Sequence, residues 1–404
     1  MKVVQINMTP NGSTGKIMRQ ITSTARAAGI EAYSFTTEIF SVKKKAPRVD
    51  EENLHYFGSF FENMLHNYLG KLLGLNGYFS YFGTLGLIRE LKKISPDIVH
   101  LHNLHNFCIN LPLLFRYLKK NNIKVVWTLH DCWAFTGHCP HFDMCGCDKW
   151  KSGCFKCGQL RGYPKSYLNT SKTMYNAKRK MFTSLENLTL VTPSEWLAGL
   201  VRESFLKDLP IKVINNGIDL SVFKPTPSDF RKKFGLEDKK LVLAVSFGWG
   251  KRKGLDALLE LARRLPENYT LCLVGTNEEL DKTLPGNIIS IHRTNNQKEL
   301  AEIYSAADVF VTPTREDNFP TVNLEALACG TPVVTFRTGG SPECIDLTCG
   351  SVVGKDDIDA MEKEIIRICE EVPYSKEACL KRSERFSMQE RFDEYIGLYL
   401  ELIK

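Results

Sequence analysis

Short apolar runs alternate with amphipathic stretches along the whole chain of 404 residues. The runs have the length and β-branched content of buried strands, and the stretches repeat apolar residues at helical spacing. We predict strands at Lys2–Asn7, Ile98–His102, Lys124–His130, Leu188–Thr192, Ile211–Asn215, Leu241–Phe247, Thr270–Gly275, Ile288–His292, Val309–Thr312 and Pro332–Phe336. We predict helices at Ile17–Ala28, Leu85–Lys93, Leu255–Leu265 and Lys298–Ala306. This alternation predicts an α/β fold, with parallel sheets covered by helices on both faces.

The strands form two series, which predicts two doubly wound, Rossmann-like domains rather than one barrel. Residues 216–240 carry glycine, two prolines and several charges without a strand pattern, as a linker does. We therefore predict an N-terminal domain at 1–212, a C-terminal domain at 213–386, and a closing helix at 387–404 that crosses back onto the first domain. Ligands of open parallel sheets bind outside the carboxyl ends of the strands, so we expect a site in a cleft between two facing domains.

Composition narrows the class of protein. Hydrophobic residues make up 43% of the chain and charged residues 25%, which is typical of a soluble globular protein. We find neither a signal-peptide pattern nor an apolar run of roughly 20 residues, and expect a cytoplasmic protein. The net charge of +7 is clustered at Lys43–Lys45, at Lys119–Lys120 with Lys124, and at Lys178–Lys180. These clusters suit a solvated face, or peripheral contact with anionic lipids on the inner face of the membrane. No nucleic-acid reader motif accompanies them, so we expect no nucleic-acid partner.

The richest segment is DVFVTPTREDNFPTVNLEALACGTPVV, residues 308–334. A predicted strand leads into an acidic loop, and a helix runs from Thr321 to Gly330, a glycine that suits a helix C-cap. The first turn of that helix offers backbone N–H groups to a diphosphate, and Glu325 could accept two hydrogen bonds from a ribose diol. Carboxylate spacing alone favours a plainer interpretation, in which the acids only stabilise the start of a helix.

The complete string resembles the signature of the retaining GT-B glycosyltransferases of family 4, also called group 1: a loop acid, seven residues, a glutamate, and then Ala-x-Ala-Cys-Gly-x-Pro-Val. The resemblance implies that Glu325 binds the nucleotide ribose and that Asp317 and its neighbours hold the donor sugar. The neighbours expected to bind the donor are Asn318, Phe319, Pro320 and Thr321. The family usually has glutamate at the loop position, so Asp317 is a departure, and Glu316 is the alternative.

A second segment, FGWGKRKGLDALLEL at residues 247–261, follows the first strand of the second series. Arg252 and Lys253 lie at a helix start, where cations are unfavourable unless an anion neutralises them. An exposed basic turn is the alternative. The resemblance implies that Lys253 binds the donor diphosphate. Phe247 stands where the family has an arginine, and Arg252 is the candidate for the missing charge.

The first half adds a glycine-rich turn and several histidines at predicted strand ends. An ordinary strand–helix turn explains residues 11–16 equally well, but the resemblance implies that Gly15 lies against the donor. It also implies that His130, at the end of KVVWTLH, is the active-site histidine that positions the donor sugar. The string HLHNLHN adds His100, His102 and His105, which suit a metal site or, as we prefer, polar lining on the acceptor side.

Six of the thirteen cysteines fall between Cys132 and Cys157. Cys154-x-x-Cys157 is half of a zinc knuckle, which Cys139 with Cys147 (or Cys145) could complete. Chance clustering of small buried side chains is the alternative. The segment at 132–160 is similar to a Cys-rich insertion in a bacterial polysaccharide-synthesis subgroup of the family. We expect structural zinc there and no catalytic zinc.

These residues together predict a reaction. The only Asp-x-Asp string is Asp357-Ile-Asp359, for which helix capping is the simpler explanation. Lys253, Arg252 and the helix start at Thr321 could stabilise a departing diphosphate without a metal, so we expect no catalytic cofactor. The residues expected to take part in catalysis are His130, Asp317 and Lys253.

The resemblance implies retention of anomeric configuration, with a nucleotide-sugar donor and a glycan or lipid-linked acceptor in polysaccharide synthesis. A sugar-nucleotide 2-epimerase and a non-catalytic, zinc-stapled binding module are the alternatives. A nicotinamide dehydrogenase is disfavoured because no G-x-G-x-x-G follows the first strand.

Overall fold

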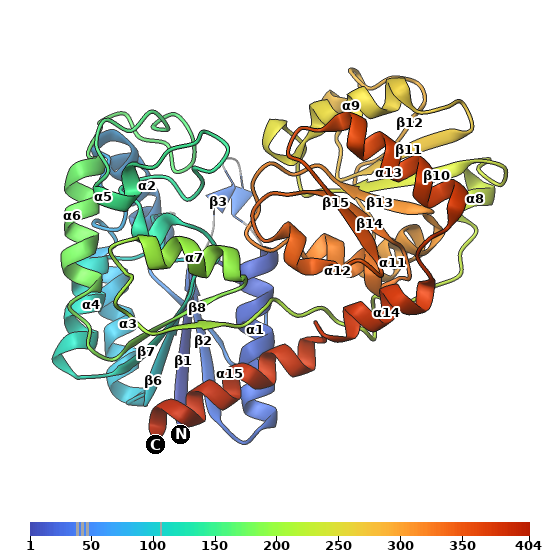
Figure 1. Ribbon diagram of the computed structural model, residues 1–404. Helices are drawn as coiled ribbons and strands as arrows, with labels where there is room; N and C mark the ends of the chain where they lie inside the picture. The colour runs from blue at the N-terminus through green and yellow to red at the C-terminus, as the bar shows by residue number, and fades with distance from the viewer. Residues whose placement is uncertain (38–39, 42–43, 46–47, 106) are drawn as a thin grey trace. The chain divides into compact units, whose positions relative to one another are not determined.

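The computed structural model describes residues 1–37, 40–41, 44–45, 48–105 and 107–404 (Figure 1). The chain divides into two compact units. The first contains Met1–Ile214 and Phe392–Lys404, and the second contains Asn215–Arg391. Each unit is built on its own parallel sheet.

The sheet of the first unit has seven strands in the order β5-β2-β1-β6-β7-β8-β9, and all of its pairs are parallel. Its strands are β1 (Lys2–Asn7), β2 (Glu31–Thr37), β5 (Leu54–Phe57), β6 (Ile98–Leu101), β7 (Lys124–Thr128), β8 (Leu188–Thr192) and β9 (Ile211–Val213). A short antiparallel ribbon pairs β3 (Phe40–Ser41) with β4 (Lys44–Lys45). The strand order reverses between β1 and β6, which is where such sheets bind ligands.

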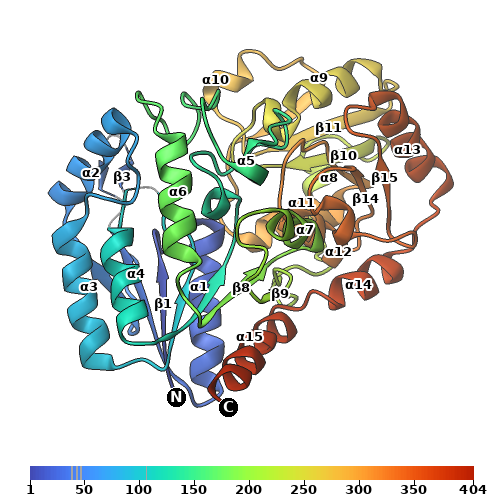
Figure 2. The ribbon, with the colours of Figure 1, turned by 60° about the vertical axis from the view of Figure 1, so that its left-hand side comes forward.

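The helices of the first unit are α1 (Gly12–Ala27), α2 (Phe60–Leu73), α3 (Tyr81–Ile94), α4 (Leu111–Lys120), α5 (Lys149–Ser152), α6 (Ser171–Phe182) and α7 (Glu195–Glu203), with a 3-10 turn η1 (Trp133–Phe135). In both ribbon views α3, α4 and α6 lie on one face of the sheet, and α1 lies on the other (Figures 1 and 2). α4 illustrates the cause: Leu111, Leu114 and Leu118 recur at helical spacing and are all buried, and Asn110 caps the helix start.

The last helix, α15 (Met388–Ile403), belongs to the first unit from Phe392 onward. The Tyr399 hydroxyl lies 2.6 Å from His100 Nδ1, and the Tyr395 hydroxyl lies 3.2 Å from Thr128 Oγ1. Lys124 also bonds the carbonyl of Leu402. The C-terminal helix therefore covers the strand face that carries His100.

The sheet of the second unit has six parallel strands in the order β12-β11-β10-β13-β14-β15. They are β10 (Lys240–Val245), β11 (Tyr269–Val274), β12 (Ile288–Ile291), β13 (Val309–Thr312), β14 (Val333–Phe336) and β15 (Gly350–Val353). Alternate residues of β10 enter two different cores: Leu241 and Leu243 join one, and Val242 and Ala244 the other. Because side chains alternate across a strand, both faces of the sheet are buried.

The helices of the second unit are α8 (Phe230–Lys233), α9 (Leu255–Arg264), α10 (Glu278–Asp281), α11 (Gln297–Ala306), α12 (Thr321–Ala328), α13 (Ile358–Glu371) and α14 (Lys376–Glu384), with 3-10 turns η2 (Lys251–Lys253) and η3 (Ser341–Cys344). α9 and α13 share one core, and α11 and α12 share the other. α12 ends as predicted, with Gly330 in the left-handed region just after it (φ +82°).

Candidate active site

The two donor-binding segments predicted from the sequence meet at the place where the strand order of the second unit reverses, between β10 and β13. One segment follows β10 and forms η2, and the other follows β13 and leads into α12. The backbone N–H of Arg315 donates to the carbonyl of Arg252 at 2.8 Å, which joins the two loops directly. The carboxyl ends of β10 and β13 are therefore the candidate active site of this unit.

Lys253 and Asp317 form an ion pair between these loops. Lys253 Nζ lies 2.5 Å from Asp317 Oδ2, and both side chains are mostly buried. Arg252, in the same turn, donates from Nη1 to the carbonyl of Glu316 at 3.0 Å. The predicted cations thus lie beside the predicted acids, although the loops are 64 residues apart in the sequence.

Arg315 holds the site together, and sequence reasoning missed it. Its guanidinium bonds both carboxylate oxygens of Asp256, one of Asp356, and the carbonyl of Lys251. The hydrogen bonds from Arg315 lower the pKa of Asp256. Arginine forms such bidentate pairs readily. Arg315 therefore fixes η2 against the loop after β13, and no local sequence signal identifies partners so distant in the chain.

Two glycines allow the backbones of these loops to pack in close contact with each other. Gly254 has φ +76°, and a Cβ there would lie 2.1 Å from the carbonyl oxygen of Pro313. Gly339 has φ +54°, and a Cβ there would lie 1.8 Å from the carbonyl oxygen of Asp317. Any larger residue at either position would displace the loop that carries Asp317.

Glu325 lies one turn into α12, where its carboxylate accepts a hydrogen bond from the Tyr304 hydroxyl at 3.0 Å. Burial and the neighbouring Glu325 carboxylate raise the pKa of Tyr304, so its hydroxyl keeps the proton. α12 begins after Pro320, which as the N-cap residue makes no side-chain hydrogen bond to the first turn. Its first N–H groups are therefore suited to an anion.

The neighbours of Asp317 have different surroundings. Asn318 and Glu316 are buried in the loop. Phe319 packs into the hydrophobic core against Phe386, with ring centroids 5.7 Å apart, so its side chain supports the loop and only its backbone can face a ligand. Thr321 begins α12, and Pro320 precedes it. Phe247, at the position of the family's arginine, is fully exposed.

In the first unit the glycine-rich turn follows β1 and opens α1. Asn7, the last residue of β1, donates to the Thr9 carbonyl at 2.9 Å and accepts from the backbone N–H of Asn103, beyond β6, at 3.1 Å. A Cβ on Gly15 would lie 2.3 Å from the backbone of Pro10. Gly15 is therefore required for packing of the turn itself, whatever it contributes to a ligand.

His130 belongs to a row of histidines beyond β6 and β7. His102 Nδ1 lies 3.0 Å from His130 Nε2, and the two rings stack with centroids 5.3 Å apart. His102 Nε2 lies 2.8 Å from Gln5 Oε1, and His100 lies between Thr128 and Tyr399. Burial lowers the pKa of His130 to about 4 and that of His100 to about 3. The row is therefore uncharged at neutral pH.

Burial changes the interpretation of the other histidines. His100 and His102 are completely buried and use both ring nitrogens, so the expected acceptor-side lining is wrong for these two. His105 pairs with Asp131 at 2.7 Å and lies 2.9 Å from the Tyr163 hydroxyl. His105, by its charge and its hydrogen bond, helps hold the pKa of Asp131 at about 2 against the effect of burial.

The neutral buried histidines predict a loss of stability in acid. His66 and His100 have folded pKa values of about 3, below their ordinary value of 6.5, so the unfolded chain takes up their protons first as the pH falls. Stability is complete above pH 6.5 and is lost from there toward the folded pKa. In that window each of these histidines lowers the free energy of unfolding by about 1.4 kcal/mol for each unit that the pH falls.

We expect the free energy of unfolding of the first unit to fall by at least about 2 kcal/mol between pH 6.5 and 5. Urea unfolding followed by tryptophan fluorescence measures it, since Trp127, Trp133, Trp150 and Trp196 all lie in that unit. A free energy that stays level over this range would show that the histidines titrate normally.

The Cys-rich loop has a small aromatic core of its own. Phe142 stacks on Trp150 with centroids 4.9 Å apart, and Phe135 packs edge-on against Trp150. Cys139 and Cys157 share a hydrogen bond, which lowers the pKa of Cys157, and Cys154 Sγ accepts from the Gly137 N–H at 3.1 Å. Across the described part of the chain, no three His, Cys, Asp or Glu side chains are arranged as a metal site. The structural zinc therefore stays a prediction.

Metal analysis of the purified protein tests the zinc prediction. We expect one zinc ion per chain and a lower melting temperature after treatment with a chelator. Cys154→Ser should lose the ion, and Cys379→Ser, at a cysteine of the second unit, should keep it. If the purified protein contains no metal and melts at the same temperature with and without chelator, the zinc prediction is wrong and the loop carries only reduced thiols.

One residue of the predicted basic clusters is buried, whereas its neighbours Arg179 and Lys180 are exposed. Lys178 is buried on the inner face of α6; its Nζ donates to the carbonyls of Trp133 (2.7 Å) and Thr136 (3.1 Å) and lies over the Trp133 ring. Burial lowers its pKa to about 7. Lys119 and Lys120 are exposed at the end of α4, and the side chains of Lys43–Lys45 lie outside the described residues.

Asp357, as expected, caps α13 through the N–H of Ala360.

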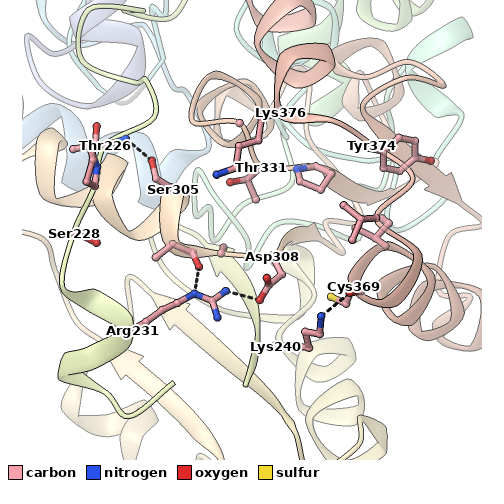
Figure 3. Close-up of a pocket in the computed structure, with 17 residues that line it drawn as sticks. Thr226, Ser228, Arg231, Lys240, Ser305, Asp308, Thr331, Cys369, Tyr374 and Lys376 are labelled. Carbon is pink, nitrogen blue, oxygen red and sulfur yellow. Dashed lines mark hydrogen bonds and ion pairs between the residues drawn. The ribbon is translucent and has the colours of Figure 1, made fainter. Parts of the chain in front are cut away.

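A separate cavity of about 500 Å³ lies at the opposite edge of the second sheet (Figure 3). It is lined by residues at the amino ends of strands, including Lys240, Asp308 and Pro332. Figure 3 shows Arg231 paired with Asp308 and Lys240 bonded to the carbonyl of Cys369. None of the predicted site residues lines this cavity, so it is not the candidate active site.

Comparison with known protein families matches both units. Residues 40–222 match the model described as Glycosyltransferase Family 4, and residues 228–385 match the model described as Glycosyl transferases group 1. The chain belongs to the group 1, family 4 glycosyltransferases. This glycosyltransferase is 26% identical over 336 residues to the Escherichia coli protein named as colanic acid biosynthesis glycosyl transferase WcaC, covering 80% of this chain and 81% of that one.

Solved structures confirm the two-domain GT-B fold of this glycosyltransferase. Sucrose-phosphate synthase of Thermosynechococcus elongatus matches with a TM-score of 0.74 at 19% identity, covering 100% of this chain and 99% of the other. Anabaena HepE in complex with UDP matches with a TM-score of 0.69 at 14% identity, covering 99% and 100%. At these identities the likeness shows the fold alone.

Proposed function

We propose that the enzyme transfers a sugar from a nucleoside-diphosphate sugar to a hydroxyl of a glycan or lipid-linked oligosaccharide, in the synthesis of a bacterial polysaccharide. The observation that carries the proposal is the pairing of Lys253 with Asp317 at the reversal point of the second sheet, with Glu325 one turn into the helix that follows this loop. A cation, a sugar-binding acid and a ribose-binding acid are the groups that a nucleotide sugar requires. The named role of the Escherichia coli relative and the UDP bound to the Anabaena protein agree with it.

Each residue then has a part in donor binding. Lys253, now paired with Asp317, would bind the diphosphate together with the first N–H groups of α12. Asp317 would accept hydrogen bonds from the donor sugar, and Glu325, oriented by Tyr304, would accept them from the ribose. Arg252 and Arg315 would keep the loops in place.

The chemistry is substitution at the anomeric carbon with retention. The acceptor oxygen forms a bond to C1 on the face from which the diphosphate leaves, and the bond between C1 and the phosphate oxygen breaks. The acceptor's proton passes to the departing phosphate. Positive charge from Lys253 and the helix N–H groups stabilises the leaving group, so the proposed reaction requires no divalent metal.

A thermal-shift screen in buffer without added divalent cations tests donor binding. We expect UDP-, GDP- or another nucleotide sugar to raise the melting temperature, because a ligand of the native state stabilises it by mass action. The nucleotide that does so identifies the donor base. Folded protein that responds to none of these compounds would overturn the proposal.

A further inference from the structure

Helix α2 has its polar and apolar faces reversed relative to an ordinary surface helix. Phe61, Leu65 and Tyr68 are 74%, 54% and 65% exposed, and Met64 and Leu72 on the same stripe are exposed as well. The residues that α2 buries are Asn63, His66 and Gly70. A surface helix normally buries its apolar stripe, so this arrangement leaves an unusually large apolar surface uncovered.

Hydrogen bonds hold α2 in this orientation. His66 Nδ1 lies 2.7 Å from Ser80 Oγ, and His66 Nε2 accepts from the Gly77 N–H at 3.1 Å. Glu62 accepts from the first N–H groups of α3, those of Phe82 (2.6 Å) and Gly83 (2.8 Å). Burial lowers the pKa of His66 to about 3, so it stays neutral. The outward position of the apolar stripe is therefore built into the fold.

Neighbouring segments extend the same surface. Tyr81 and Phe82, at the start of α3, are 48% and 78% exposed. Tyr167 and Leu168 are also exposed, and the Tyr167 N–H donates to the carbonyl of Lys71 at the end of α2 (2.8 Å). Glu62 of α2 bonds the first N–H groups of α3, so these two helices meet where Tyr81 and Phe82 lie. We call this set the α2 surface: Phe61, Met64, Leu65, Tyr68, Leu72, Tyr81, Phe82, Tyr167 and Leu168.

The charges around the α2 surface favour a lipid bilayer as its partner. Lys71 and Lys165 lie at its edge, each with its ammonium group over an aromatic ring, of Phe107 and Tyr167 respectively. The carboxylate of Glu62 is bound to backbone N–H groups. Exposed phenylalanine, leucine and tyrosine bordered by lysine are the composition of segments that lie in the headgroup region.

We propose that the α2 surface docks the first unit on a membrane containing anionic lipids. No helix within the described residues is long and apolar enough to cross a membrane, so α2 would lie in the interface. The inference extends the proposed function: a lipid-linked acceptor would be met at the membrane on which the enzyme rests. The α2 surface takes the place of the cluster at Lys178–Lys180, in which Lys178 is buried, as the proposed means of attachment.

Vesicle co-sedimentation of the full chain tests the proposal. The vesicles are phosphatidylcholine alone, and phosphatidylcholine mixed with phosphatidylglycerol. We expect the triple variant Phe61→Ser, Leu65→Ser, Tyr68→Ser to lower the partition coefficient about tenfold or more, because three inserted side chains are lost. Leu347→Ser, at an exposed leucine of the second unit, should bind like the wild type. Lys71→Gln with Lys165→Gln should weaken binding to the anionic vesicles only.

Two results would overturn the proposal. One is wild-type protein that binds neither kind of vesicle; the other is a triple variant that binds as well as the wild type. If the wild type forms a dimer that the triple variant cannot form, and neither binds vesicles, the α2 surface is an interface between two copies. The thermal shift with nucleotide sugar should be unchanged in the triple variant, so failure of membrane binding and failure of donor binding are separate outcomes.

Discussion

Replacing Glu325 by alanine should remove most of the thermal stabilisation that a nucleotide sugar provides. A carboxylate that accepts two hydrogen bonds from a ribose contributes about 3 kcal/mol to binding, or about a hundredfold in affinity. At a donor concentration of 100 times Kd, the wild type gains about 2.7 kcal/mol, and a hundredfold weaker variant gains only about 0.4 kcal/mol. Thermal-shift titration with the donor measures both.

Two further variants separate binding from folding in this prediction. Glu302→Ala, on the same helix α11 as Tyr304, removes a glutamate that has no proposed role and should respond like the wild type. Tyr304→Phe leaves Glu325 in place but removes the hydroxyl that orients it, so KM for the donor should rise by several-fold with little change in kcat. A full thermal shift in Glu325→Ala would show that the ribose lies elsewhere.

Replacing Lys253 by methionine should have the largest effect on turnover. Removing one preorganised charge or hydrogen-bond donor from a developing anion lowers kcat by a factor of about 10² to 10³. Lys253 is the cation that we propose binds the diphosphate. Its loss also leaves Asp317 without its partner, which adds repulsion against the donor phosphates. Steady-state release of nucleoside diphosphate from the donor measures the effect.

The neighbouring residues supply controls for this prediction. Lys251→Met removes the same charge from an exposed position of the same turn and should keep kcat near that of the wild type. Asp317→Glu restores the acid that the family usually has and should remain active. Equal kcat values for Lys251→Met and Lys253→Met would contradict a specific contact between Lys253 and the diphosphate. Only the total positive charge of the turn would then matter.

The alternation of apolar runs and helices was enough to predict the fold class. β1, β8 and β13 begin and end at the predicted residues, and most other predicted strands differ by one or two residues at an end. The short ribbon of β3 and β4 was missed, as were β2, β5 and β15 of the parallel sheets. β2 reads EAYSFTT, and its buried Ser34 and Thr36 break the apolar pattern; Ser34 is stabilised by a hydrogen bond to Thr22. Tertiary hydrogen bonds of this kind have no local signal.

The candidate site could be predicted in its residues but not in its connections. Strings such as NFPTVNLEALACGTP and KRKG identify Glu325 and Lys253, because each string is continuous in the sequence. The pairing of Lys253 with Asp317 and the fixing role of Arg315 depend on how β10 and β13 lie together. Lys178 shows the opposite case: it lies among Met174, Tyr175 and Phe182 on the buried face of α6, a local pattern that the interpretation of Lys178–Lys180 as a charged surface did not use.

The most direct test of the central claim follows the slow hydrolysis of an α-linked nucleotide sugar by the enzyme in buffer without added divalent cations. Proton NMR distinguishes the two anomers of the released sugar before they equilibrate, and no knowledge of the acceptor is needed. Retaining, metal-independent transfer predicts that the α-anomer is released first and that added Mg²⁺ or Mn²⁺ does not change the rate. Release of the β-anomer first, turnover only with an added divalent cation, or a donor epimerised at C2 would contradict it.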